Sequence, residues 1–220
     1  MPSHREPLVI DLVSDFVCPW CYIGFRALDW AKMALSFQYT LNVRYRPYRL
    51  DPGISPEGRD RKATLEAKFP DISQRQKIQE ALNEAMQDVG LNFDPQLPER
   101  LPDTTDAHRL VRWAGEEGLA HEAVAALFDA YWQSGMDISR AEVLNIAADE
   151  AGLDGADMVR RLETGEDRDA VRQEAAELRG GGVRGVPAFI INETAGFEGA
   201  LRKGALIESL RILAAETAAP

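Results

Sequence analysis

The feature that most constrains this chain is a pair of cysteines three residues apart, Cys18-Pro19-Trp20-Cys21. The apolar run before the pair, residues 8–13, predicts a buried strand, and residues 22–35 predict a helix. Residues i and i+3 of a helix share a face, so the two thiols lie close enough for a disulfide. No other cysteine occurs in the 220 residues. The pattern predicts that one strand delivers both thiols to the first turn of a helix.

The two thiols are expected to differ in chemistry. Cys18 would lie among the unpaired N–H groups of the helix N-terminus, which favour a thiolate, so it is predicted to be the exposed nucleophile. Cys21, one turn further on, is predicted to be the buried resolving thiol. Pro19 suits the first helical turn because its missing N–H would have no partner there. Trp20 is expected to be partly exposed and to form part of an apolar lip for a substrate chain.

Three other interpretations of the pair stay open. The first is a structural disulfide. The first apolar run is too short for a signal peptide, so a cytoplasmic location is predicted, and a structural disulfide is disfavoured in that reducing compartment. A structural zinc site needs four ligands, and His4, His108 and His121 are scattered, so no metal is expected. The third alternative is chance spacing of two core cysteines.

The charge of the chain limits its partners. The net charge is −11, whereas nucleic acids and anionic membranes bind basic surfaces, so neither is an expected partner. No stretch approaches the ~18 apolar residues of a membrane span. Solubility is the simplest explanation of the acidity.

The strand and helix at the cysteines extend into a larger pattern. A second strand at residues 41–48 completes a strand–helix–strand unit, which predicts parallel pairing with a right-handed crossover. No strand is predicted between residues 59 and 165. Ser73 and Ser139 are expected helix N-caps, the latter in a capping box with Glu142. Helices are expected at residues 60–69, 73–89, 105–117, 120–134, 139–151, 156–164 and 166–178.

The C-terminal part returns to strands. A glycine-rich approach leads to Val186-Pro187 and a short apolar strand that ends near residue 191. Residues 194–197 are predicted to form the second strand of a hairpin, with Asn192-Glu193 at its turn. Residues 203–216 predict a last amphipathic helix.

This interrupted α/β architecture resembles the thioredoxin fold with an inserted all-helical domain, as in the DsbA family. The implied division is a discontinuous thioredoxin-like domain, residues 1–55 and 166–220, and a helical insertion domain, residues 56–165. The closer resemblance is to FrnE-like dithiol-disulfide oxidoreductases. It is carried by residues 15–24 (DFVCPWCYIG), 46–48, 50–52, 105–110, 127–132 and 185–189.

The resemblance implies further site residues. Val186-Pro187 is expected to be a cis bond near Cys18, with the Val186 backbone offered to substrate as an added strand. His108 is expected either to face a cleft between the subdomains and bind substrate or to be solvated. Asp11 is expected either to relay protons to Cys21 or, more simply, to be a satisfied structural aspartate.

Some residues depart from the family pattern. Trp20 replaces the histidine of the DsbA dipeptide, which predicts only a moderately oxidising pair. Thr104-Thr105 and Leu201 also differ from the family at segments that face the substrate groove, so substrate preference is the property they would change.

The predicted function is thiol-disulfide exchange. The chain is expected to be a protein disulfide oxidoreductase or isomerase with no cofactor, glutathione as a co-substrate, and client thiol or disulfide proteins as partners. The alternative is a glutathione-dependent isomerase or transferase of the 2-hydroxychromene-2-carboxylate isomerase or kappa-class type, although those relatives usually place serine at the nucleophile position. A third alternative is a non-catalytic redox-responsive binding module.

Overall fold

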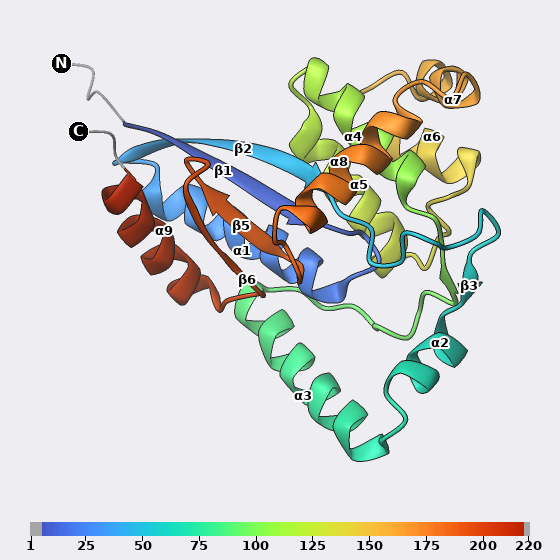
Figure 1. Ribbon diagram of the computed structural model, residues 1–220, viewed down its shortest axis with the longest axis horizontal. Helices are drawn as coiled ribbons and strands as arrows, with labels where there is room; N and C mark the ends of the chain where they lie inside the picture. The colour runs from blue at the N-terminus through green and yellow to red at the C-terminus, as the bar shows by residue number, and fades with distance from the viewer. Residues whose placement is uncertain (1–5, 218–220) are drawn as a thin grey trace.

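The sheet at the centre of the fold carries the cysteine helix. The computed structural model describes residues 6–217. Its four-stranded sheet has the order β2-β1-β5-β6 (Figure 1). The predicted parallel pairing of the first two strands and the predicted C-terminal hairpin are both confirmed. The strands are β1 (Glu6–Ser14), β2 (Tyr39–Pro47), β5 (Ala188–Ile191) and β6 (Ala195–Glu198).

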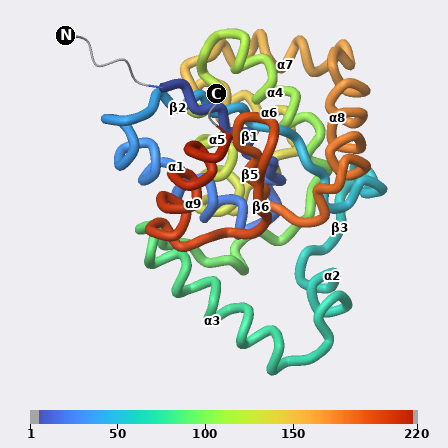
Figure 2. Tube along the Cα trace, turned by 60° about the vertical axis from the view of Figure 1, so that its left-hand side comes forward, coloured from blue at the N-terminus to red at the C-terminus, as the bar shows by residue number. Residues whose placement is uncertain are grey.

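Helices cover both faces of this sheet. Figure 2 shows α1 (Pro19–Leu35) and α9 (Lys203–Thr217) on one side of the strands and α8 (Arg168–Gly180) on the other. β1 alternates between these two layers, as a strand buried on both faces must. Leu8, Ile10 and Leu12 join the core beneath α1 and α9, whereas Val13 packs in a smaller cluster with residues of the α8 side. The predicted α/β class is therefore confirmed.

Most of the insertion between β2 and α8 is helical. Helices α4 to α7 gather beyond the C-terminal ends of β1 and β2, while α2 and α3 extend to one side (Figure 1). The bounds of the helices are α2 (Arg61–Lys68), α3 (Ile72–Val89), α4 (Thr105–Glu116), α5 (Ala120–Phe128), α6 (Ala141–Glu150) and α7 (Gly155–Glu163).

Two features of the insertion differ from the prediction. Residues 59–165 do contain strands, because β3 (Arg59–Asp60) pairs antiparallel with β4 (Arg100–Leu101). Two residues are too few to show an alternating pattern. The predicted helix over residues 120–134 changes at Phe128 into a π-helical turn, η1 (Asp129–Gln133).

Both predicted serine caps are wrong. The α3 helix begins at Ile72, one residue before Ser73, and the carboxylate of its N-cap, Asp71, accepts from the backbone N–H groups of Ser73 and Gln74. The N-cap of α6 is Arg140, and the Ser139 hydroxyl instead donates to Asp137. At α3 the carboxylate of Asp71 therefore makes the hydrogen bonds that a capping serine would make, whereas the N-cap side chain of α6 makes no capping hydrogen bond.

None of the helices within residues 6–217 combines the length and the apolar character that crossing a membrane requires.

Candidate active site

The two cysteines lie where β1 passes into α1. Cys18 is the N-cap of the helix and Pro19 is at its first position, as predicted. The backbone N–H of Cys21 donates to the Cys18 carbonyl at 3.0 Å and so closes the first turn. Both thiols are free. Cys21 is fully buried, as expected, but Cys18 is only 6% exposed, so the prediction of an exposed nucleophile is wrong and the thiol is almost entirely covered by its neighbours.

The environment separates the two thiols electrostatically. The Cys21 thiol donates to Cys18, and the backbone N–H groups of Cys21 and Trp20 also point at its sulfur, which lowers the pKa of Cys18 below its ordinary value. Burial and the neighbouring Cys18 thiolate raise the pKa of Cys21 well above that value. The helix N-terminus therefore favours one thiolate, at Cys18, and keeps the proton on Cys21.

The loop before β5 packs against this helix turn. The Val186-Pro187 bond is cis, and the Val186 carbonyl oxygen lies 3.7 Å from Cys18 Sγ, so the predicted cis bond and its position near Cys18 are confirmed. Gly24 makes the close approach possible, because a Cβ at this position would lie 2.9 Å from Pro187 Cγ. Glycine inside a helix costs about 0.5–1 kcal/mol relative to alanine. The helix accepts that cost where Pro187 contacts it.

The insertion holds the segment that precedes Cys18. The indole N–H of Trp132, in the π-helical turn, donates to the Phe16 carbonyl at 2.9 Å. The Phe16 ring packs against Phe128 at 5.0 Å and against His108 at 4.9 Å between centroids. All these groups are buried. The position of the cysteine turn therefore depends on the helical insertion as well as on the sheet.

A buried carboxylate, Asp15, accompanies the cysteines. It is 2% exposed, and its Oδ2 accepts the backbone N–H of Leu50 at 2.7 Å. Burial raises the pKa of Asp15 to about 6, although the Leu50 N–H opposes that shift. Its negative charge acts on both cysteines and raises the pKa of each. At neutral pH this carboxylate therefore opposes the helix N-terminus at Cys18.

Two alternatives were predicted for His108 and two for Asp11, and the structure contradicts one of each pair. His108 is not solvated: it is 6% exposed, and its Nε2 lies 3.2 Å from the Tyr48 carbonyl oxygen. Burial lowers the pKa of His108 to about 4, so the ring is neutral. Asp11 accepts two hydrogen bonds of 2.6 Å from Arg44. Ile10 and Leu12 face α1, and neighbouring residues of a strand point to opposite faces, so Asp11 points away from Cys21. Asp11 is therefore a satisfied structural aspartate and not a proton relay to Cys21.

Among the remaining predicted site residues, Pro19, Trp20 and Val186 are partly exposed beside Cys18. The sequence interpretation assigned no role to Asp15, Gly24 or Trp132. Two of them carried a signal: Gly24 interrupts a helical pattern, and Asp15 is a charge at the end of an apolar run. Trp132 carried none, because its partner is more than 100 residues away.

A family model and a curated relative match most of the chain. A family model described as DSBA-like thioredoxin domain matches residues 9–210. The uncharacterized protein YwbO of Bacillus subtilis (strain 168) is 29% identical over 188 residues, 84% of this chain and 87% of its own length.

Solved structures resemble the fold along its whole length. A probable DsbA oxidoreductase from Streptomyces coelicolor superposes with a TM-score of 0.84 at 26% identity, covering 97% of this chain and 92% of its own. A 2-hydroxychromene-2-carboxylate isomerase has a TM-score of 0.69 at 15% identity (96% and 98% covered). The cytosolic disulfide reductase DsbM from Pseudomonas aeruginosa, solved with GSH, has a TM-score of 0.63 at 17% identity (94% and 98% covered). At such identities the last two show a shared fold alone.

Proposed function

Since this chain belongs to the family of DSBA-like thioredoxin domains, we propose that it is a thiol-disulfide oxidoreductase that uses Cys18 and Cys21 as its redox pair. The observation that carries the proposal is the unequal environment of the two thiols. The sulfur of Cys18 faces the first-turn N–H groups and lies 3.7 Å from the Val186 carbonyl, whereas Cys21 is buried and keeps its proton.

The reaction is an exchange of sulfur–sulfur bonds. The Cys18 thiolate attacks one sulfur of a client disulfide, the client bond breaks, and the departing client sulfur leaves as a thiolate that takes a proton from water. The resulting mixed disulfide joins Cys18 to the client. Cys21 then attacks Cys18 Sγ, loses its proton to solvent, and expels the second client thiolate. Two electrons pass from the cysteine pair to the client, and the reverse sequence oxidises a client dithiol.

The timing of the second attack follows from the same electrostatics. The Cys18 thiolate is one of the groups that raise the pKa of Cys21. In the mixed disulfide that negative charge is gone, so the pKa of Cys21 falls and its thiolate becomes accessible. Cys21 is therefore activated only after Cys18 has reacted, which prevents both thiols from being charged at once.

The groups around Cys18 indicate the kind of substrate. Val186 presents its backbone beside the reactive sulfur, where an extended peptide can add as a strand. Trp20 and Pro19 provide an apolar border. Because no second cysteine pair exists in the chain, an external thiol must reset the site, and we assign that part to glutathione, the ligand named for the DsbM neighbour. This cycle belongs in a reducing compartment such as the cytoplasm.

The test is reduction of insulin by dithiothreitol. The wild-type chain should accelerate the reaction and Cys18→Ser should abolish the acceleration. Equal rates for the two proteins would leave only a non-catalytic module. Turnover of a small aromatic compound by Cys18→Ser with glutathione would instead favour the isomerase alternative. Equilibration with glutathione buffers should give only a moderately oxidising potential, and a value as high as ~−120 mV would contradict this.

A further inference from the structure

Helix α1 carries an apolar stripe on its outer surface, away from the cysteines. Its members are Trp30, Met33, Ala34 and Phe37, at spacings i, i+3, i+4 and i+7. Trp30 is 41%, Met33 60% and Phe37 87% exposed. Ser36, the residue after the helix, still has right-handed helical dihedrals, so Phe37 continues the same face. This spacing is the one by which a helix presents an apolar stripe to a partner.

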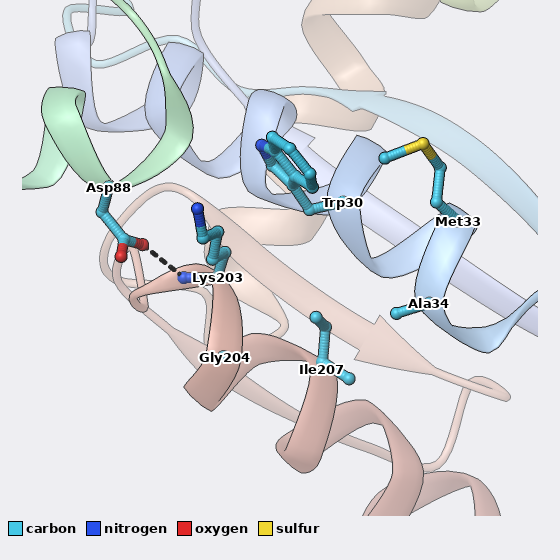
Figure 3. Close-up of a pocket in the computed structure, with 7 residues that line it drawn as sticks. All are labelled: Trp30, Met33, Ala34, Asp88, Lys203, Gly204 and Ile207. Carbon is cyan, nitrogen blue, oxygen red and sulfur yellow. Dashed lines mark hydrogen bonds between the residues drawn. The ribbon is translucent and has the colours of Figure 1, made fainter.

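A groove of about 590 Å³ runs beside the stripe. Figure 3 shows Trp30, Met33 and Ala34 on one wall and Gly204 and Ile207, from α9, on the other. Asp88 and Lys203 close the end near Trp30, where the Lys203 ammonium lies 4.6 Å from the centroid of the Trp30 ring. The surface thus combines a protruding aromatic ring, Phe37, with a neighbouring apolar hollow.

The stripe is complementary to itself about a two-fold axis. If two copies of α1 pack antiparallel with the axis between Met33 and Ala34, Trp30 of each copy faces Phe37 of the other. Met33 then faces Ala34, a large side chain opposite a small one, which lets the helices approach closely. An interface of this kind, in which residue i meets residue j and j meets i, is what a symmetric dimer requires.

Charge also favours a second copy. The chain has a net charge of −11, so most of its surface repels another copy. Residues 30–50, which include the stripe, contain no aspartate or glutamate, and Lys32 is the only charged residue between Trp30 and Phe37. The α1 stripe itself can therefore approach its own copy without placing carboxylates against each other, and Asp88, the carboxylate at the end of the groove, lies beside Lys203.

The exposed area is of the size that marks an interface. At ~200 Å² for a large aromatic side chain, Trp30 and Phe37 together expose ~250 Å². Met33, Ala34 and the groove wall add to this area, and an exposed apolar patch of a few hundred Å² often marks an interaction site. We propose that the α1 stripe and its groove form a two-fold dimer interface with a second copy of this chain.

The active sites would remain open in this dimer. Cys18 lies about 16 residues from the axis, or ~23 Å along the helix at 1.5 Å per residue. The two cysteine pairs are then at opposite ends of the paired helices. Dimerisation and redox activity are separate properties, and loss of one does not imply loss of the other.

The experiment is sedimentation velocity over a wide range of protein concentration. Wild type should approach twice the chain mass of 24.4 kDa, and Met33→Glu should stay at 24.4 kDa. Ile146→Glu is the matched control, because Ile146 is 43% exposed on α6, outside the stripe, and this variant should dimerise. Circular dichroism should show that all three are folded. A wild type that stays monomeric, or a Met33→Glu variant that assembles normally, would overturn the proposal.

The register has its own test. In the antiparallel arrangement position 30 faces position 37 of the other copy. The double variant Trp30→Lys with Phe37→Glu should therefore dimerise more tightly than Trp30→Glu with Phe37→Glu, which places like charges opposite each other. Equal association of the two double variants would show that these positions do not meet.

Discussion

Asp15 is a buried acid whose replacement by asparagine should change stability in a pH-dependent way. Its pKa is raised from 3.8 to about 6 in the folded protein by burial. Because the folded state binds this proton more tightly than the unfolded state, ionising Asp15 costs stability as the pH rises from 3.8 through about 6. The difference between the two pKa values corresponds to about 3 kcal/mol at about 1.4 kcal/mol per pKa unit.

The Asp15→Asn variant removes this ionisation. Its side-chain carbonyl can still accept the Leu50 N–H, whereas its amide N–H groups, if unpartnered, add a cost of about 1–3 kcal/mol that does not depend on pH. The quantity to compare is the difference in unfolding free energy between variant and wild type. It should shift in favour of the variant by about 2–3 kcal/mol between pH 4 and pH 7.

Urea denaturation of both proteins at several pH values measures this difference. A second readout is the ultraviolet absorbance of the thiolate, because removing the Asp15 charge should lower the pKa of Cys18. A difference in stability that is the same at pH 4 and pH 7 would refute the reasoning. So would an unchanged Cys18 titration.

Three further predictions concern the surroundings of the site. Gly24→Ala should place a Cβ against Pro187, and this overpacking should lower the unfolding free energy measured in urea by about 1–3 kcal/mol. The variant should also reduce insulin more slowly. Wild-type activity would show that the contact between position 24 and Pro187 does not matter for the reaction. Burial lowers the pKa of His108 from 6.5 to about 4, so the wild-type protein loses unfolding free energy as the pH falls through that range. Between pH 7 and pH 4 the His108→Gln variant should lose up to about 3 kcal/mol less unfolding free energy than the wild type. Equal losses in the two proteins would refute this. Asp11→Asn should lower the unfolding free energy by about 1–2 kcal/mol through weaker Arg44 pairing while the redox potential stays constant, and a changed potential would revive the proton relay.

Local sequence patterns predicted most of the fold. The strand–helix–strand unit at the cysteines has a clear change from apolar run to helical spacing, and its strands pair as expected. Local patterns did not predict elements whose conformation depends on tertiary contacts. The π-helical turn at Asp129–Gln133 brings Trp132 to the Phe16 carbonyl, a contact between residues 116 positions apart that no local spacing encodes.

The same distinction applies to the site. Cys18, Cys21 and the cis Pro187 could be placed from motif and resemblance, because helix geometry fixes the first two and the family pattern the third. The burial of His108 could not be predicted from the sequence, because a histidine near a helix start is exposed or buried according to which residues pack over it. The division into two domains, at residues 55 and 165, stays a prediction. The hydrogen bond from Trp132 to the Phe16 carbonyl joins the two parts.

The central claim is that Cys18 attacks and Cys21 resolves. The most direct measurement is mass spectrometry of Cys21→Ser and Cys18→Ser after incubation with glutathione disulfide. The account predicts one stable glutathione adduct on Cys18 in the Cys21→Ser variant, which cannot resolve it, and almost none on the buried Cys21 of Cys18→Ser. Equal adducts on both variants, or an adduct only on Cys21, would contradict the assignment.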